Sequence, residues 1–342
     1  MGAPSSRTAR LDAFQRRHSW LGFPLGVIYK MVDDRAIFLA ALITYYAFVS
    51  LFPLLLLFIS IMGFILQSHP GIRSDIVNSA IADVPGIGPV LRDNVQGFKG
   101  SPIGVAVGVL GILYGGLGAA QSAQAAFNQM YAVPRNEQPN PITSRLRSLG
   151  WLAFLGIALV LSSGINFLVS NRNGISAELG IGLKVLTYGV DFLINAGLFM
   201  VAFRVLTATE LRWRDVVTGG AVAGAGWELL QAFGSRFVVQ QVNHGSSLYG
   251  VFGVVLAVLA VVYLVALLVM TSVEINVVRA RRLWPRSLLA PFTDDIDPTP
   301  ADLNAYRSYA TAQRFKGWQQ VAVRFEPGGT DPEADGAVTP PV

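Results

Sequence analysis

The residues best suited to chemistry in this sequence are polar side chains placed inside long apolar segments. Between positions 181 and 206, four of them recur at spacings of four, three and four: Lys184, Tyr188, Asp191 and Asn195. Residues at these spacings share one face of an α-helix. A lysine there attracts anions, and a carboxyl group in a low-dielectric setting holds its proton to a higher pH than usual. The spacing therefore predicts a polar stripe along one helix.

Two charged residues of the next apolar segment, Glu228 and Arg236, extend this stripe. Counting depth at about 1.5 Å per residue puts Asp191 and Glu228 near the bilayer midplane and Arg236 and Asn166 in its outer half. A charge at the bilayer centre costs about 2.5–3.5 kcal/mol on insertion scales, so such groups face protein or water. We expect a polar cleft open to the outer side. The alternative is that these charges only hold helices together.

Further polar positions lie toward the opposite ends of the apolar segments. Gln121, Gln124 and Asn128 share a helical face. They form either the inner wall of the same pathway or, the favoured interpretation, an amphipathic helix emerging into the cytoplasm. Glu274 and Asn276 precede an arginine cluster. For Glu274 we favour a simple ion pair with Arg279 or another basic neighbour.

Catalytic and metal-binding patterns are missing from the sequence. The histidines, His18, His69 and His244, are far apart and have no ligand partners at metal-site spacing. The chain contains neither a nucleophile elbow nor a phosphate-binding glycine loop. His244 and the serines after it are a weak basis for a membrane-embedded hydrolase, which is the least favoured hypothesis. We predict no catalytic residues, no metal and no cofactor.

The composition is that of a membrane protein. Of 342 residues, 52% are hydrophobic and 14% are charged, whereas soluble domains carry about 25% charged residues. Mean hydropathy is +0.49. The net charge of +5 admits nucleic-acid binding, but arginine-rich cytoplasmic loops explain it better. We predict an all-α, polytopic membrane fold that binds no nucleic acid.

Six segments are long and apolar enough to cross about 30 Å of hydrocarbon. They cover residues 36–66, 103–131, 149–170, 181–206, 216–239 and 251–278. The first contains Pro53, which removes a backbone donor and favours a kink or tilt. Lys and Arg concentrate in the two ends of the chain and in the loops after the second and fourth segments, which predicts that both termini are cytoplasmic.

Three regions flank this 36–278 membrane domain. Residues 1–35 form a cytoplasmic segment with an interfacial helix at 19–32, and two amphipathic stretches at 72–82 and 89–98 are expected on the outer face. The tail, 279–342, is predicted to be partly disordered, with a helix starting after the cap Thr299 and running to about Trp318. Small-residue motifs such as Gly104-xxx-Gly108 allow helices to pack closely. We expect this packing within one chain, and packing between chains of a homo-oligomer is the alternative.

Several motifs resemble those of the YihY/BrkB family of inner-membrane proteins. The most specific is the run at 40–54, Ala-Ala-Leu-Ile-Thr-Tyr-Tyr-Ala-Phe-Val-Ser-Leu-Phe-Pro-Leu. Tyr-Gly-Gly-Leu-Gly at 114–118, Trp-Glu at 227–228, Tyr-Gly at 249–250 and Ser-Val-Glu-Ile-Asn at 272–276 also fit. Family members often have Ala where this chain has Val273. The resemblance covers about residues 20–285.

The resemblance implies a six-span bacterial inner-membrane protein. Some members of that family were labelled ribonuclease BN, but this chain has no metal cluster for phosphodiester hydrolysis. Others are linked to serum resistance or to moving lipid precursors in the envelope. The leading hypothesis is therefore a transporter-like or flippase-like protein whose cleft takes the headgroup of an envelope lipid or other amphiphile. The alternative is a scaffold that recruits envelope-assembly proteins.

Overall fold

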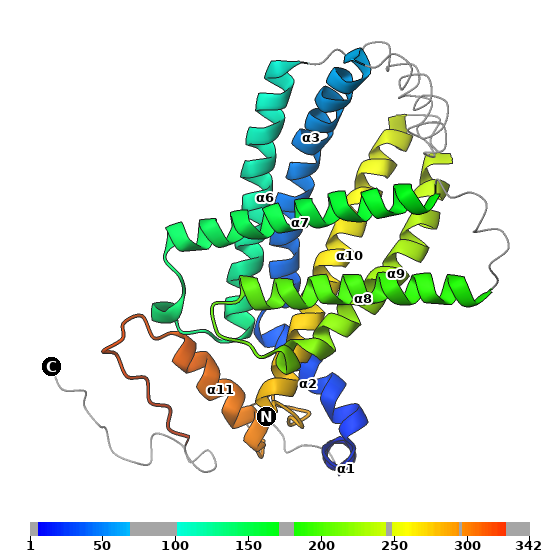
Figure 1. The fold of residues 1–342 in the computed structure, drawn as a ribbon. Coiled ribbons are helices and arrows are strands. Elements are labelled where there is room, and N and C mark those ends of the chain that lie inside the picture. The colour runs from blue at the N-terminus through cyan, green and yellow to red at the C-terminus, as the bar shows by residue number, and fades with distance from the viewer. Residues whose placement is uncertain (1–5, 69–100, 171–180, 244–247, 294–295, 326–342) are drawn as a thin grey trace.

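The computed structural model describes residues 6–68, 101–170, 181–243, 248–293 and 296–325 (Figure 1). Apart from turns, its regular elements in these ranges are helices, so the predicted all-α fold is confirmed. They are α1 Ser6–Arg17, α2 Ser19–Asp33, α3 Ala36–Ser68, α6 Pro102–Met130, the short 3₁₀ helix η2 Arg135–Glu137, α7 Pro141–Ser170, α8 Ile181–Leu206, α9 Trp213–Asn243, α10 Leu248–Arg281 and α11 Pro300–Ala312.

Four of the described helices contain a stretch long and apolar enough to cross a membrane. These stretches are Ala36–Ile61 in α3, Pro102–Met130 in α6, Gly189–Leu206 in α8 and Val255–Arg281 in α10. The remaining two expected spans fall in α7 and α9, which are helical but are not among these four stretches. In Figure 1, α3 and α6 run up the view while α7 and α8 run across it. The protein is polytopic, and the count of six spans stays a prediction.

A series of glycines on α6 brings α3 into close contact. A Cβ atom added at Gly108 would lie 2.8 Å from Leu57 Cβ, and one at Gly115 would lie 2.6 Å from Ser50 Cβ. At Gly111 an added Cβ would overlap the ring of Pro53. Helix α3 is continuous through Pro53, which lies inside it. The glycine spacing therefore serves packing within this chain, as expected.

Helix α9 uses glycines on two sides. Gly220 and Gly224 face Met200 and Ala196 of α8, whereas Gly219 faces Ser272 and Asn276 of α10. Small residues on both faces let α9 lie between α8 and α10 with its backbone close to each.

Several sequence predictions concern the ends of the chain. A helix was expected at 19–32 and is found as α2, while the α1 helix at 6–17 was not expected. The tail helix begins after Thr299, which forms a capping box with Asp302. It ends at Ala312, short of the expected Trp318, because Arg314 turns to bond Asn136 and Glu137 of the α6–α7 connection. The stretches 72–82 and 89–98 and the tail beyond 325 lie outside the described residues.

Candidate functional site

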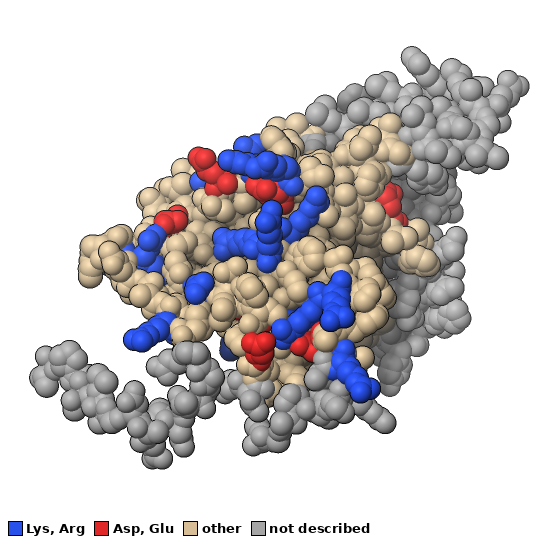
Figure 2. All heavy atoms as spheres, turned by 90° about the horizontal axis from the view of Figure 1, so that it is seen from below, with Lys and Arg blue, Asp and Glu red and all other residues tan. Residues whose placement is uncertain are grey.

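Charged side chains gather at one end of the molecule. Figure 2, which views the molecule from below, shows Lys and Arg spread over this face together with Asp and Glu. In the described residues, α3, α6 and the first 31 residues of α10 (248–278) contain no Lys or Arg, whereas α1 contains four arginines, the segment after α10 contains two, and the α6–α7 and α8–α9 connections contain one each. This charged end holds the two ionic groupings, around Lys30 and Arg286, that are described below.

The most deeply buried grouping centres on Lys30 of α2. Its ammonium group donates to the Asp34 carboxylate one helical turn later and to the Met130 carbonyl oxygen at 3.0 Å. Glu274 of α10 lies 3.8 Å away, and Lys30 and Glu274 are 1% and 0% exposed. The Lys30 ammonium group also lies 5.1 Å from the centre of the Tyr309 ring. One cation thus joins α2, the end of α6, α10 and α11.

Two carboxylates compete for this single ammonium group. Burial raises the pKa of Asp34, and the nearby Lys30 charge opposes that rise. Neither carboxylate oxygen of Glu274 accepts a hydrogen bond from the described residues, so Lys30 supplies its nearest opposite charge. The favoured interpretation of Glu274 as an ion-pair partner fits this geometry, with Lys30 rather than Arg279 as the partner.

Asn276 joins α9 to α10 beside this grouping. Its side-chain oxygen accepts a hydrogen bond of 2.6 Å from the backbone N–H of Gly219. The contact requires glycine, because a Cβ atom at 219 would overlap both Ser272 and Asn276. Asn276 therefore fixes the register of two helices.

The polar residues of α6 also bond to neighbouring elements. Gln124, 2% exposed, donates to Ser148 Oγ at 2.7 Å and to the Ser144 carbonyl at 2.9 Å. Asn128, 4% exposed, accepts a hydrogen bond from the Ala208 N–H at 2.7 Å. Gln121 is half-buried. The two buried side chains hold α7 and the α8–α9 loop instead of emerging into solvent.

A second ionic grouping, around Arg286, fastens the tail helix. Arg286, 1% exposed, contacts Asp302 at 2.8 Å and Asp33 at 2.5 Å, and the Tyr309 hydroxyl donates to Asp33 at 3.1 Å. Burial alone would lower the pKa of Arg286, but the hydrogen bonds to Asp302 and Asp33 outweigh it and raise that pKa. These contacts dock α11 onto α2.

The stripe predicted from the sequence is only partly assembled by the described side chains. Asn195 of α8 donates to the Glu228 carboxylate of α9 at 2.8 Å. Asp191, four residues earlier, is exposed on the outside of α8. The side chains of the remaining predicted members lie outside the described residues: Lys184, Tyr188, Arg236 and Asn166.

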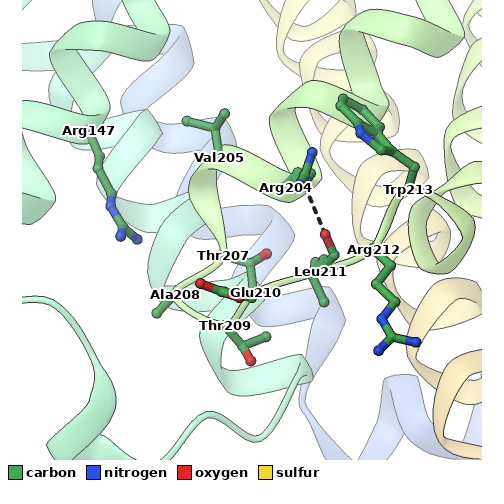
Figure 3. A pocket seen from close by; sticks show the side chains of 10 residues that line it. All are labelled: Arg147, Arg204, Val205, Thr207, Ala208, Thr209, Glu210, Leu211, Arg212 and Trp213. Carbon is green, nitrogen blue, oxygen red and sulfur yellow. Dashed lines mark hydrogen bonds between the residues drawn. The ribbon is translucent and has the colours of Figure 1, made fainter.

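Sequence reasoning missed Lys30, Asp34 and Arg286, although the four-residue spacing of Lys30 and Asp34 was a readable signal. It also treated Arg147 and Arg212 only as topology markers. Both line a pocket of about 850 Å³ beside the α8–α9 loop, shown in Figure 3. No group of three or more metal-type ligands occurs in the described part of the chain.

A family model described as Virulence factor BrkB matches residues 27–295. The chain belongs to this family. The BrkB match includes Lys30, Glu228, Glu274 and the 40–54 run, and it agrees with the resemblance expected for about 20–285. It ends before α11, so the docked tail helix lies outside the matched residues.

Curated relatives are named as UPF0761 membrane proteins. One from Methylibium petroleiphilum is 32% identical over 130 residues, which are 36% of this chain and 30% of that protein. One from Psychrobacter sp. is 24% identical over 296 residues, covering 81% of this chain and 52% of that protein. The chain thus spans about half or less of these relatives' length. No solved structure matches.

Proposed function

We propose that this BrkB-family protein is transporter-like or flippase-like and moves an envelope lipid or another amphiphile past the polar residues of α8 and α9. The observation that carries the proposal is the placement of Asp191. It is exposed on the surface of α8, within the apolar stretch Gly189–Leu206. A carboxylate facing acyl chains within an apolar stretch is costly, so it needs water or a polar ligand beside it.

The Asn195–Glu228 hydrogen bond supports the same proposal. It places a second carboxylate about one helical turn from Asp191 along α8, and Glu228 is itself only half-buried. A headgroup passing this position would meet two acidic groups and an amide, while its acyl chains stay in the lipid. Lys184 and Arg236 remain proposed anion-attracting members of the path.

We further propose that the protein lies in the bacterial inner membrane with both termini in the cytoplasm. The gathering of Lys and Arg at one end supports this orientation, because short cytoplasmic loops carry an excess of both residues. Residues 1–35 and 279–342 would then flank the 36–278 membrane domain on the inner side. Membrane lipids are the proposed partners, with no nucleic acid and no catalytic step.

A reconstituted lipid-translocation assay tests the proposal. Native protein in liposomes is expected to move a labelled lipid faster than empty liposomes, and Asp191→Asn and Glu228→Gln should each slow it. Asp297→Asn, at an exposed site after α10, is the matched control. If native protein and empty liposomes translocate lipid at the same rate, the proposal fails.

A scaffold that recruits envelope-assembly proteins is the second candidate, favoured by the docked tail. Phe315 and Trp318, just beyond α11, are 55% and 85% exposed on the charged end. Deleting 287–342 would not test this function cleanly, because it also removes Asp302 from the buried Arg286. Phe315→Ser with Trp318→Ser keeps the Arg286 grouping. Each variant is expressed in cells that lack the native protein, and restoration of function is measured. If the Phe315→Ser, Trp318→Ser variant fails to restore function while Asp191→Asn succeeds, the result favours the scaffold.

A further inference from the structure

A groove lies between α3 and α10, which pack against each other (Figure 1). Its lining comes from residues between 41 and 48 of α3 and between 256 and 263 of α10. At about 1.5 Å per residue, each of these segments extends for about 10 Å along its helix. The groove has a volume of about 400 Å³, which falls within the range of about 300–1,000 Å³ typical of small-molecule sites.

The lining of this α3–α10 groove is apolar. None of the described residues that line it is charged. Thr44, which is 4% exposed, already donates its hydroxyl group to the Ala40 carbonyl oxygen at 2.8 Å. The other polar atoms of its side chains are the hydroxyl groups of Tyr45 and Tyr263. The groove therefore suits a hydrocarbon ligand and offers no opposite charge to an ionic headgroup.

The groove lies at membrane depth. Its α3 residues belong to the apolar stretch Ala36–Ile61 and its α10 residues to the stretch Val255–Arg281. Tyr45 and Leu256 are 60% and 55% exposed, so the groove is open on one side. In a bilayer, the medium around such stretches is the hydrocarbon of acyl chains and not water.

The shape of the lining favours a flexible chain over a helix of a second copy. Interfaces between membrane helices are enriched in small residues, which let the two backbones approach closely. Most of the residues that line this groove are bulky, namely Tyr45, Phe48, Leu256, Leu259 and Tyr263. A helix of about 10–12 Å diameter cannot approach closely over them, whereas an extended acyl chain can lie between them.

We propose that the α3–α10 groove binds an acyl chain of a membrane lipid. The lipid is held by its tail, so the chemistry of its headgroup does not matter for binding. This site goes beyond the proposed transport function, which concerns a headgroup at α8 and α9. A lipid bound here would be a stable neighbour of the helix bundle whether or not the protein moves lipid.

Photolabelling in liposomes tests the site. The full chain is reconstituted in phosphatidylcholine that contains a small fraction of phosphatidylcholine with a diazirine on its acyl chain, and labelled residues are located by mass spectrometry after illumination. We expect more label on Tyr45 than on Tyr114, an exposed tyrosine of α6 (70% exposed) outside the groove. Equal labelling of the two tyrosines would show contact with bulk lipid only and would overturn the proposal.

A groove-filling variant sharpens this test. Ala260→Phe places a ring in the lining, and Ala106→Phe, at an exposed site in the apolar stretch of α6, is the matched control. Ala260→Phe should lower the labelling of Tyr45 by about fourfold or more, which is the effect of losing contact with about one methylene group. Both alanines are exposed, so both variants should keep the native unfolding temperature. Unchanged labelling in Ala260→Phe, or an equal loss in Ala106→Phe, contradicts an acyl-chain site.

Two further measurements separate the acyl chain from other occupants. The sequence contains no cysteine, so Ala260→Cys introduces a single thiol at the groove. We expect this variant to stay monomeric under oxidation, whereas disulfide-linked dimers in high yield would assign the groove to a second copy. A phosphatidylglycerol probe with the same diazirine chain should label Tyr45 as strongly as the phosphatidylcholine probe, and a strong headgroup preference would overturn recognition by the tail. Because no translocation is measured, failure of this site leaves the transport proposal standing.

Discussion

Two regions of this molecule place charges in an apolar protein in different ways. At the charged end, Lys30 and Arg286 are each 1% exposed and each contacts two carboxylates from different elements. On α8 and α9, Glu228 has one amide partner and Asp191 is exposed. Removing one member of a buried ion pair leaves an uncompensated buried charge and lowers the free energy of unfolding strongly. Removing an exposed charge changes the free energy of unfolding little. The first arrangement stabilises the fold, and the second is suited to a ligand.

The largest expected effect is that of Lys30→Met. It leaves Asp34 and Glu274 buried without their cation and should lower the free energy of unfolding by about 3–5 kcal/mol. Thermal unfolding of the detergent-solubilised protein measures the loss. Lys316→Met, at an exposed site, is the control. Adding Glu274→Gln to Lys30→Met should recover part of the loss, and equal unfolding temperatures for both lysine variants would contradict the assignment.

Gly219→Ala should rank next. The new methyl group would overlap Ser272 and Asn276 of α10, and overpacking of this kind costs about 1–3 kcal/mol. Gly197→Ala, on α8 where an added Cβ meets no atom within 4 Å, should be neutral or slightly stabilising. Unfolding temperatures of the two variants check the prediction, which fails if Gly197→Ala is the more harmful.

Thr299→Ala tests the docking of the tail. Its side chain caps α11 by accepting from the Asp302 N–H, and losing such a cap costs about 0.5–2 kcal/mol. Asp302 also holds Arg286, so limited proteolysis should cut first near α11 while the rest of the chain stays resistant. Thr311→Ala, exposed at the other end of the helix, should not change the cleavage pattern.

The smallest expected effect on stability belongs to Glu228→Gln. The amide oxygen of glutamine can still accept from Asn195, so the free energy of unfolding should change by less than about 1 kcal/mol. The rate of lipid translocation should nevertheless fall, because the charge is gone. If Glu228→Gln lowers the free energy of unfolding as much as Lys30→Met does, the proposed difference between the two regions is contradicted.

The sequence was sufficient for the parts of the fold that hydrophobic length and glycine spacing determine. Runs of about 20 apolar residues predict membrane helices directly. The small-residue motifs predicted close helix packing within the chain, and the structure shows that Gly108 and Gly115 make it with α3. The stop of α11 at Ala312 depended on Arg314 bonding to residues almost 180 positions away. No local pattern encodes such a contact.

The candidate site was predictable only where partners are near in sequence. The helical spacing of Asp191 and Asn195 was visible, but the bonding of Asn195 to Glu228 needs the α8–α9 packing. Lys30 and Glu274 are brought together by the packing of α2 on α10. The lining of the α8–α9 pocket likewise includes Arg147 of α7 and Arg212 of the α8–α9 loop, which are far apart in the sequence.

The glycine series of α6 has a mechanical consequence. Each glycine receives a side chain of α3, from Leu57 to Ser50, with the Pro53 ring between them. Sliding or turning either helix would drive these side chains into backbone, so the two helices behave as one stiff wall. If the proposed lipid path opens, the elements that move are therefore expected to be helices other than α3 and α6.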